Sequence, residues 1–437
     1  MELPITIHRT VRESWRELVM VHGLVAAAGM LALVALMPLV PALLPVLTLI
    51  VCIALIVRHR EARTTSRWRA WNTPLPYAIA LYLMHVIGML WTADQAFGWF
   101  DLQVKAPLLV FPLLALWMPR SAWVGRGILV FAFSISCTIA VAICIAAAAW
   151  RVASGTGLSA EQVVFSSAWS LFLHPSYFAW YLCTAIAAWC LLPIPRRLNV
   201  WIDRAVLAFL AVGVVLCGSK IGWLLLVVEL VTLLVLRWGD TRLRSMLQRG
   251  ILGSMIAIVA LVSGSRYARD RVQEAWHAAT EGHHEATGAT SSEVRWLTWA
   301  SARELIAEHP IIGTGTGDIK DELMRVYRQR GYTTAADHRL NAHDQFLQTA
   351  ACLGIPGLLL LVVMLLVPLF ARGGRDEFTV VFLLITLVNW LVESMLEVQA
   401  GTLFFSFFAC VTLWSDDHRS SPPNSSSSGH HSFSEGD

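Results

Sequence analysis

The chain alternates long apolar runs with short polar connections. From residue 18 nearly to residue 414, apolar runs of about 20 residues recur, which is the length a helix needs to cross a hydrocarbon core of roughly 30 Å. The run ILVFAFSISCTIAVAICIAAAAW at 128–150 is continuously apolar, whereas the strands of a membrane β-barrel alternate between apolar and polar positions. The pattern therefore predicts an all-α, polytopic integral membrane protein.

About twelve transmembrane helices are predicted, interrupted by one long loop that is partly helical. Residues 1–263 would hold nine of these helices, 264–344 the loop, 345–414 the last three helices, and 415–437 a disordered polar tail. The predicted spans are 18–38, 41–57, 75–92, 103–118, 124–149, 175–192, 203–217, 221–236, 249–263, 345–370, 377–393 and 399–414.

Arginines in alternate connections predict the orientation of the helices. Positive side chains of short loops are retained in the cytoplasm, and arginines recur after the second, fourth, sixth, eighth and tenth spans. Both termini would then be cytoplasmic, and the loop 264–344 would be periplasmic. The basic N-terminal segment, with Arg9, Arg12 and Arg16, is interpreted as a retained anchor rather than a cleaved signal.

Composition excludes other classes of protein. With 56% hydrophobic and 14% charged residues, the chain is too apolar for an ordinary soluble domain. The net charge of +3 is mostly explained by arginines of the cytoplasmic loops, so nucleic-acid binding is not indicated. The cysteines fall within or at the edges of apolar spans, which favours small buried side chains over disulfides or metal ligands.

The long loop is the expected place for chemistry, because the other connections are short. Residues 292–308 have helical periodicity, and Ser291 or Ser292 could cap the helix. Such an amphipathic helix would lie at the membrane surface, on the outer face of the membrane that the chain spans. Arg295, near its N-terminus, would suit an anion together with the first backbone N–H groups. A surface arginine without a function is the alternative interpretation.

Two further motifs could contact phosphate. In LCGSKIGW, Lys220 stands at a short outer turn, where the distribution of cytoplasmic charge does not account for it. It could bind a phosphate, or it could simply extend to the membrane surface from a helix end. The GTGTG segment at 313–317 follows no predicted strand and precedes no GK[ST], so a flexible turn is predicted instead of a nucleotide site.

The stretch HRLNAHDQFLQTA at 338–350 places polar side chains directly before an apolar run. His338 and His343 are spaced poorly for a helical metal pair, although Asp337 and Asp344 could complete one. We predict no metal. An imidazole exchanges protons near neutral pH, so His343 is better suited to act as a general base.

Five motifs occur in a distinctive order along the chain. They are HPSYFAWYL at 174–182, GSK at 218–220, RWLTW at 295–299, HPIIGTGTG at 309–317 and HDQFL at 343–347. Together with the many spans, this order resembles the O-antigen ligase and polymerase superfamily of bacterial envelope polysaccharide enzymes. Two positions depart from the family pattern: Lys220 replaces its usual arginine, and Asp344 replaces the asparagine that usually follows the histidine.

The resemblance implies transfer of an O-antigen glycan from undecaprenyl pyrophosphate to a sugar hydroxyl of lipid A–core. The reaction would occur on the periplasmic face of the bacterial inner membrane, among membrane lipids, without a cofactor or metal, and would invert the anomeric centre. His343 would remove the hydroxyl proton, with His338 ranked second. Lys220, Arg295 and Lys105 would hold the pyrophosphate. Further substrate contacts are predicted for His174, Arg325, Arg328 and Arg339.

Three rival functions are considered. An O-antigen polymerase would use polyprenyl-linked donor and acceptor, and an oligosaccharyltransferase would transfer glycan to protein serine or threonine. A lipid-glycan transporter would be non-enzymatic. Transport would call for charges or broken helices near the middle of the membrane, and the apolar runs are expected to carry few charges.

Overall fold

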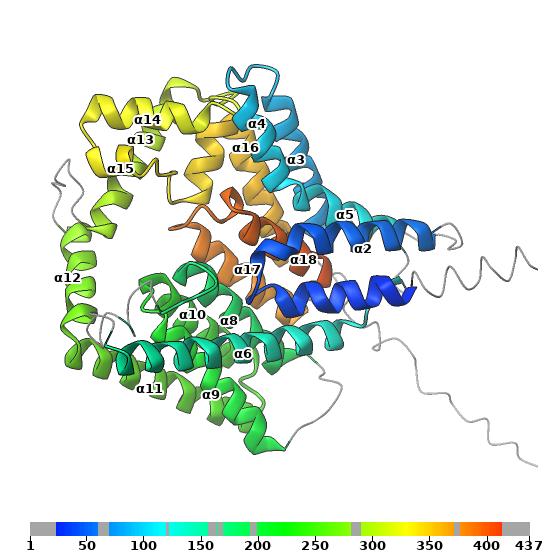
Figure 1. Cartoon of the computed structure of the whole chain (residues 1–437), viewed down its shortest axis with the longest axis vertical. Coiled ribbons are helices and arrows are strands. Elements are labelled where there is room, and N and C mark those ends of the chain that lie inside the picture. Colours follow the sequence, from blue (N-terminus) through cyan, green and yellow to red (C-terminus); the bar gives the residue numbers. More distant parts are fainter. Residues whose placement is uncertain are drawn as a thin grey trace, which may run out of the picture.

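The computed structural model describes residues 23–59, 70–118, 122–155, 163, 169–192, 199–280, 290–370 and 376–412. Every regular element in these ranges is a helix and none is a strand (Figure 1), which confirms the all-α prediction. The predicted N-terminal anchor and the predicted tail at 415–437 lie outside the described residues.

Each predicted apolar segment contains a helix. Up to the long loop, the helices are Gly23–Leu36, α2 (Leu44–His59), α3 (Leu75–Gly88), α4 (Gln95–Lys105), α5 (Pro107–Trp117), α6 (Arg126–Ala153), α8 (Pro175–Leu191), α9 (Val200–Leu216), α10 (Lys220–Leu236) and α11 (Thr241–Gly264). The loop contains α12 (Arg266–Thr280), α13 (Ser291–Glu308), α14 (Ile319–Arg330) and α15 (Thr333–Asp337). The chain continues with α16 (Gln345–Phe370), α17 (Glu377–Trp390), the short 3₁₀ helix η4 (Met395–Glu397) and α18 (Gln399–Thr412).

Four stretches in the described part of the chain are long and apolar enough to cross a membrane. They are Gln95–Trp117, Arg126–Ala153, Leu243–Gly264 and Gln345–Phe370, and five shorter apolar helices accompany them. A membrane protein is therefore supported, while the count of twelve spans and the orientation stay predictions. The predicted span 103–118 proves to be the second part of a longer run, in which α4 and α5 meet at Pro107.

Helix α8 is the centre of the bundle. Its side chains are buried around nearly the whole helix, as expected for a helix that is apolar on all sides. Trp180 and Tyr181 pack against Phe404 of α18, with ring centroids 4.6 and 4.0 Å apart. Because α8 is fixed in this way, its N-cap residue His174 has a fixed position at one end of the bundle.

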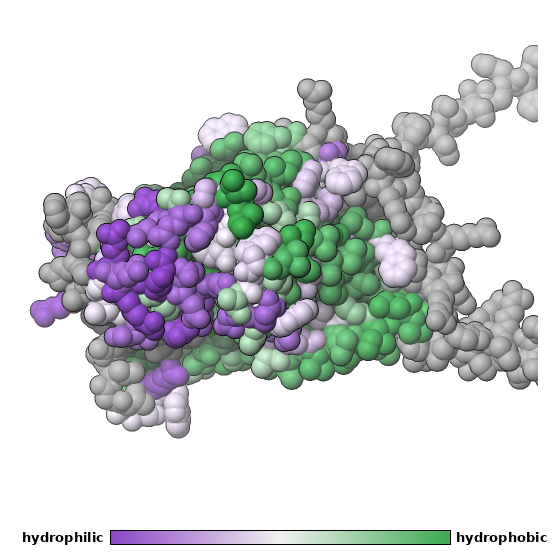
Figure 2. Space-filling model, turned by 90° about the horizontal axis from the view of Figure 1, so that it is seen from above, coloured by the Kyte–Doolittle hydropathy of each residue, from purple (hydrophilic) through white to green (hydrophobic). Residues whose placement is uncertain are grey.

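The loop helices gather at one end of the molecule. Figure 1 shows α13, α14 and α15 beside the start of α16, and α12 joining them to α11. Viewed toward this end, hydrophilic residues collect on the side where α13–α15 lie, and apolar residues dominate much of the remaining surface (Figure 2). Helices α13, α14 and α15 therefore form a packed helical cap at this end of the bundle.

The segment 313–317 anchors this cap, contrary to the predicted flexible turn. Its residues are buried, Gly313 and Gly315 have φ angles of +69° and +99°, and the Gly315 N–H donates to the carbonyl of Cys352 at 3.0 Å. It lies where α16 is broken at Gly354, whose φ is +71°. The glycines allow backbone to approach backbone, so the loop is a rigid joint and the prediction of flexibility was wrong.

Replacing Gly313 with alanine should destabilise the protein strongly. A Cβ there would lie 2.3 Å from the carbonyl oxygen of Cys352, in addition to the strain of a positive φ. Gly331 is a matched control, because its φ is +72° and no heavy atom lies within 4 Å of a built Cβ. We expect Gly331→Ala to lower the free energy of unfolding by about 1 kcal/mol. Gly313→Ala should cost roughly 1–3 kcal/mol more. Equal thermal midpoints for the two purified variants would contradict the proposed joint.

Candidate functional site

Two predicted site residues meet at one buried carboxylate. Glu393 lies in the turn after α17, and its side chain is 6% exposed. Arg295 Nη2 lies 2.6 Å from Glu393 Oε1, and His343 Nδ1 lies 3.4 Å from Glu393 Oε2. Arg295 Nε also donates to the carbonyl of Val392 at 3.2 Å. Residues almost 100 positions apart in the sequence thus form one cluster.

The Glu393 carboxylate is ionised at neutral pH. Burial raises the pKa of Glu393, but the hydrogen bond with His343 and the charge of Arg295 outweigh it and lower this pKa from 4.5 to about 2. The carboxylate faces Nδ1 of His343 and therefore favours a proton on that nitrogen. Nε2 is then the ring nitrogen that can accept a proton from a substrate.

Helix α13 holds the backbone on which His343 lies. Thr298 Oγ donates to the carbonyl of Ala342 at 3.2 Å, and Trp299 Nε1 donates to the carbonyl of His343 at 3.2 Å. Positions 295, 298 and 299 share one face of a helix, so the RWLTW motif directs three side chains to the same loop. His343 has a φ of +50°, which is uncommon for a residue with a Cβ and requires support from its surroundings.

The N-terminus of α13 contacts Lys220. Thr290, not the predicted serine, caps this helix, and it forms a capping box with Glu293. Ser292 is thereby left to accept a hydrogen bond from Lys220 Nζ at 2.7 Å. Glu274 of α12 lies 3.8 Å from the same nitrogen. Lys220 is therefore positioned one helical turn from Arg295.

His174 completes the cluster on the side of α8. Its Nδ1 lies 2.7 Å from the hydroxyl of Ser176, which donates to Glu393 Oε1 at 3.2 Å. Burial lowers the pKa of His174, and the nearby charges of Arg295 and Arg271 lower it further, although Glu393 acts in the opposite direction. His174 thus lies close to both the Glu393 carboxylate and the guanidinium groups of Arg295 and Arg271.

Sequence reasoning missed two residues of this cluster. Glu393 belongs to the VESMLE segment, which follows an apolar run and carries no motif that predicts chemistry. Arg271 of α12 lies within electrostatic range of both Lys220 and His174. The only indication in the sequence was its place in the polar loop, where several arginines look equivalent.

Lys105 has two carboxylate partners. It is 1% exposed, and its Nζ bonds Asp101 one turn earlier and Glu397 of η4, the latter at 3.0 Å. Since Glu397 and Glu393 flank the same short segment, Lys105 fixes the backbone that carries Glu393. The apolar helices also bury more ionisable side chains than the sequence predicts, namely Asp101, Lys105 and Glu229.

The remaining predicted residues lie in the cap and not in the Glu393 cluster. Arg325 forms ion pairs with Glu308 and Glu322, and Arg339 pairs with Asp321. His338 and Arg328 are both exposed.

Asp344 is the N-terminal residue before α16. Its Oδ1 accepts from the N–H of Leu347 at 2.9 Å, and its own N–H donates to Ser394. Burial raises the pKa of Asp344 to about 6. The side chain therefore caps a helix, and Glu393, not Asp344, contacts the His343 ring.

The arrangement combines a base with fixed positive charge. An imidazole backed by an ionised carboxylate can take a proton, and the charges of Lys220, Arg271 and Arg295 lie close enough to one another to interact. Within the described residues, no group of three or more His, Cys, Asp or Glu side chains is arranged to hold a metal ion. These residues suit a reaction between a hydroxyl group and an anionic leaving group.

Comparison with protein families supports the resemblance found in the motifs. A family model described as O-Antigen ligase matches residues 205–362, which run from α9 to the middle of α16. This segment contains Lys220, Arg271, Arg295 and His343, and its match to the O-antigen ligase superfamily confirms the resemblance. No curated protein matches the chain.

Replacing Glu393 with glutamine should remove stabilisation that depends on pH. The folded-state pKa of about 2 lies below 4.5, so the ionised carboxylate contributes stability that is present above pH 4.5 and lost as the pH falls toward 2. We expect Glu393→Gln to lower the free energy of unfolding by roughly 3 kcal/mol at pH 7. About 2 kcal/mol of that difference should vanish by pH 3. A difference from wild type that does not change between pH 7 and pH 3 would contradict the ion pairing.

Replacing Lys105 with methionine should destabilise the protein by leaving the buried Asp101 carboxylate and the partly buried Glu397 carboxylate without this cation. The expected loss of unfolding free energy is about 3–5 kcal/mol. Adding Asp101→Asn and Glu397→Gln to Lys105→Met removes the uncompensated charge and should restore much of the loss. Thermal unfolding of the single and triple variants checks this; a triple variant no more stable than the single one would show that packing, not charge, decides the effect.

Proposed function

We propose that the protein is a glycosyltransferase that moves an O-antigen glycan from undecaprenyl pyrophosphate to a sugar hydroxyl of lipid A–core, on the periplasmic face of the inner membrane. The observation that carries this proposal is the meeting of a carboxylate-backed histidine with several cations inside the segment that resembles O-antigen ligases. A hydroxyl acceptor needs the base, and a pyrophosphate leaving group needs the cations.

The cations bind the pyrophosphate. Lys220 bonds Ser292 in the first turn of α13, Arg295 lies one turn further along the same helix, and Arg271 adds a third charge that only the tertiary structure brings close. Ser292 and Glu274 hold the Lys220 ammonium in place before the donor arrives. As the glycosidic bond breaks, negative charge grows on the leaving phosphate, and these fixed positive groups stabilise it.

His343 removes the proton from the acceptor hydroxyl. Its Nδ1 is oriented by Glu393, so Nε2 receives the proton, and the carboxylate stabilises the imidazolium that forms. Arg295 links the two parts of the reaction, because its guanidinium contacts the same carboxylate and also belongs to the cation cluster. Loss of Glu393 would therefore disturb both the base and the anion site.

The transfer inverts the anomeric centre in one step. A covalent glycosyl-enzyme would require a carboxylate that can reach the anomeric carbon. Glu393 is 6% exposed and already engaged by Arg295 and His343, so it supports the base instead of attacking the sugar. Water or a second sugar hydroxyl can replace the acceptor hydroxyl only where it reaches His343. The side chain of His343 is 25% exposed.

The test is glycan transfer by the purified, lipid-reconstituted protein, supplied with undecaprenyl-pyrophosphate O-antigen and lipid A–core in excess EDTA. We expect glycosylated lipid A–core with the wild type and at least about 100-fold less with His343→Ala. Lys220→Gln and Arg295→Gln should also lose transfer, chiefly through the donor. Arg303→Gln, an exposed position on the same helix α13, is the control that should keep activity.

Each other outcome has a distinct meaning. Glycan growth on the polyprenyl carrier without lipid A–core would identify a polymerase instead. Activity that appears only when divalent metal is returned would overturn the metal-independent mechanism. Full transfer by a folded, inserted His343→Ala protein would remove His343 from its role as the base.

A further inference from the structure

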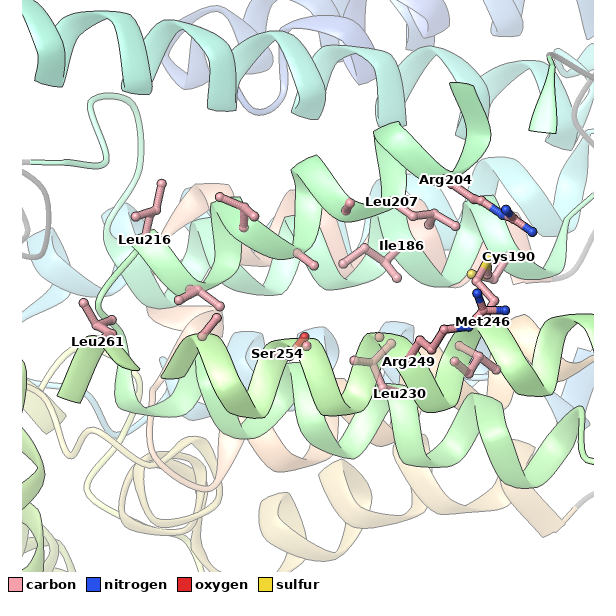
Figure 3. Close-up of a pocket in the computed structure, with 18 of the residues that line it drawn as sticks. Ile186, Cys190, Arg204, Leu207, Leu216, Leu230, Met246, Arg249, Ser254 and Leu261 are labelled. Atoms are coloured by element: carbon pink, nitrogen blue, oxygen red, sulfur yellow. The ribbon is translucent and has the colours of Figure 1, made fainter. Parts of the chain in front are cut away.

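A cavity of about 780 Å³ lies away from the Glu393 cluster, between α9 and α11. Helices α8 and α10 form its floor, and nearly all of its lining is apolar, including Leu207, Leu216, Leu230 and Leu261 (Figure 3). The two charged residues that line it are Arg204 and Arg249. Its volume is in the range of ligand-binding pockets, but its walls suit hydrocarbon more than a polar molecule.

The charge is confined to one end of this groove. Figure 3 shows Arg204 and Arg249 near Cys190 and Met246, and shows Leu216 and Leu261 at the opposite end. Twelve residues separate the two ends along either helix, which is roughly 18 Å at the helical rise. That length slightly exceeds half of a hydrocarbon core of roughly 30 Å, so the groove matches the chains of one membrane leaflet.

Arg204 and Arg249 differ from other cations of the bundle in their partners. Arg126 pairs with Asp376, and Arg237 pairs with Glu377. Among the described residues, neither Arg204 nor Arg249 forms an ion pair with a carboxylate; Arg204 stacks over Trp201, and Arg249 bonds Ser245. No carboxylate in the described part of the chain therefore neutralises these two guanidinium groups at the end of the apolar groove, and an external anion can bind them.

Helix α11 leaves the groove accessible from the side. Of the four candidate spans, it is the least buried, with 11% of its most apolar window inside the structure against 50% for each of the others. Gly250 and Gly253 line the groove, and a Cβ built on either would meet no heavy atom within 4 Å. An extended hydrocarbon chain can lie along these small residues without displacing a side chain.

We propose that this groove binds an anionic glycerophospholipid. Its phosphate lies between Arg204 and Arg249, and its acyl chains run along α9 and α11 toward Leu216 and Leu261. The charged end is opposite the end of α10 that carries Lys220, so this phosphate is held apart from the site of the proposed transfer reaction. The occupant is a leaflet lipid, since a polyprenyl donor would have its pyrophosphate at the Lys220 end.

The test is native mass spectrometry of the purified, delipidated full-length protein, titrated with phosphatidylglycerol or phosphatidylcholine of identical acyl chains. We expect phosphatidylglycerol to bind about tenfold more tightly than phosphatidylcholine. The double variant Arg204→Gln, Arg249→Gln should lose this preference, while Arg244→Gln, a nearby arginine that does not line the groove, should keep it. Gly253→Leu should weaken binding of both lipids by filling the groove.

The outcomes separate the site from general attraction of lipids to a basic surface. Equal loss in the Arg204/Arg249 and Arg244 variants, or no preference in the wild type, would overturn the proposal. The proposal would also be overturned if undecaprenyl phosphate bound the wild type more tightly than phosphatidylglycerol and displaced it, because the groove would then hold the carrier lipid. None of these measurements depends on glycan transfer, so failure of the proposed enzymatic function would leave their interpretation intact.

Discussion

The ion pair between Glu393 and Arg295 is the interaction on which the site depends. A carboxylate with a 6% exposed side chain is costly to bury, and it is tolerated here because a guanidinium, an imidazole and the Ser176 hydroxyl all contact it. Satisfying this one group draws together α8, α13, the start of α16 and the turn after α17. The same contacts set the ring orientation of His343, so stability and chemistry share a single physical cause.

Rigid joints around the cluster keep these contacts in register. Lys105 ties η4 to α4 through Glu397, and Gln345 accepts from the N–H of Leu396 at 2.7 Å on the other side of the segment. The buried loop 313–317 fixes the cap to the break in α16. The pyrophosphate site that we propose would need cations that do not relax when charge develops, and buried hydrogen bonds on both sides of the cluster favour this.

Anion binding is organised separately at the two ends of the helices that surround α10. Lys220 begins that helix beside Arg271 and α13, whereas Arg204 and Arg249 lie at its other end beside an apolar groove. The neighbours of Lys220 are polar and belong to the site of the proposed transfer reaction. The neighbours of Arg204 and Arg249 are mostly apolar side chains. In our two proposals, the same type of charge thus serves transfer chemistry at one end and lipid retention at the other.

The sequence by itself determined the helical architecture and predicted which residues carry chemistry. Apolar runs predicted each helical segment, and the order of GSK, RWLTW and HDQFL identified Lys220, Arg295 and His343. Local patterns could do this because helix periodicity and motif spacing depend on near neighbours. Only the tertiary structure could decide that Glu393 lies behind His343, that Lys105 is occupied by two carboxylates, and that the GTGTG segment is rigid. Those facts depend on contacts between distant residues, about which no local pattern carries information.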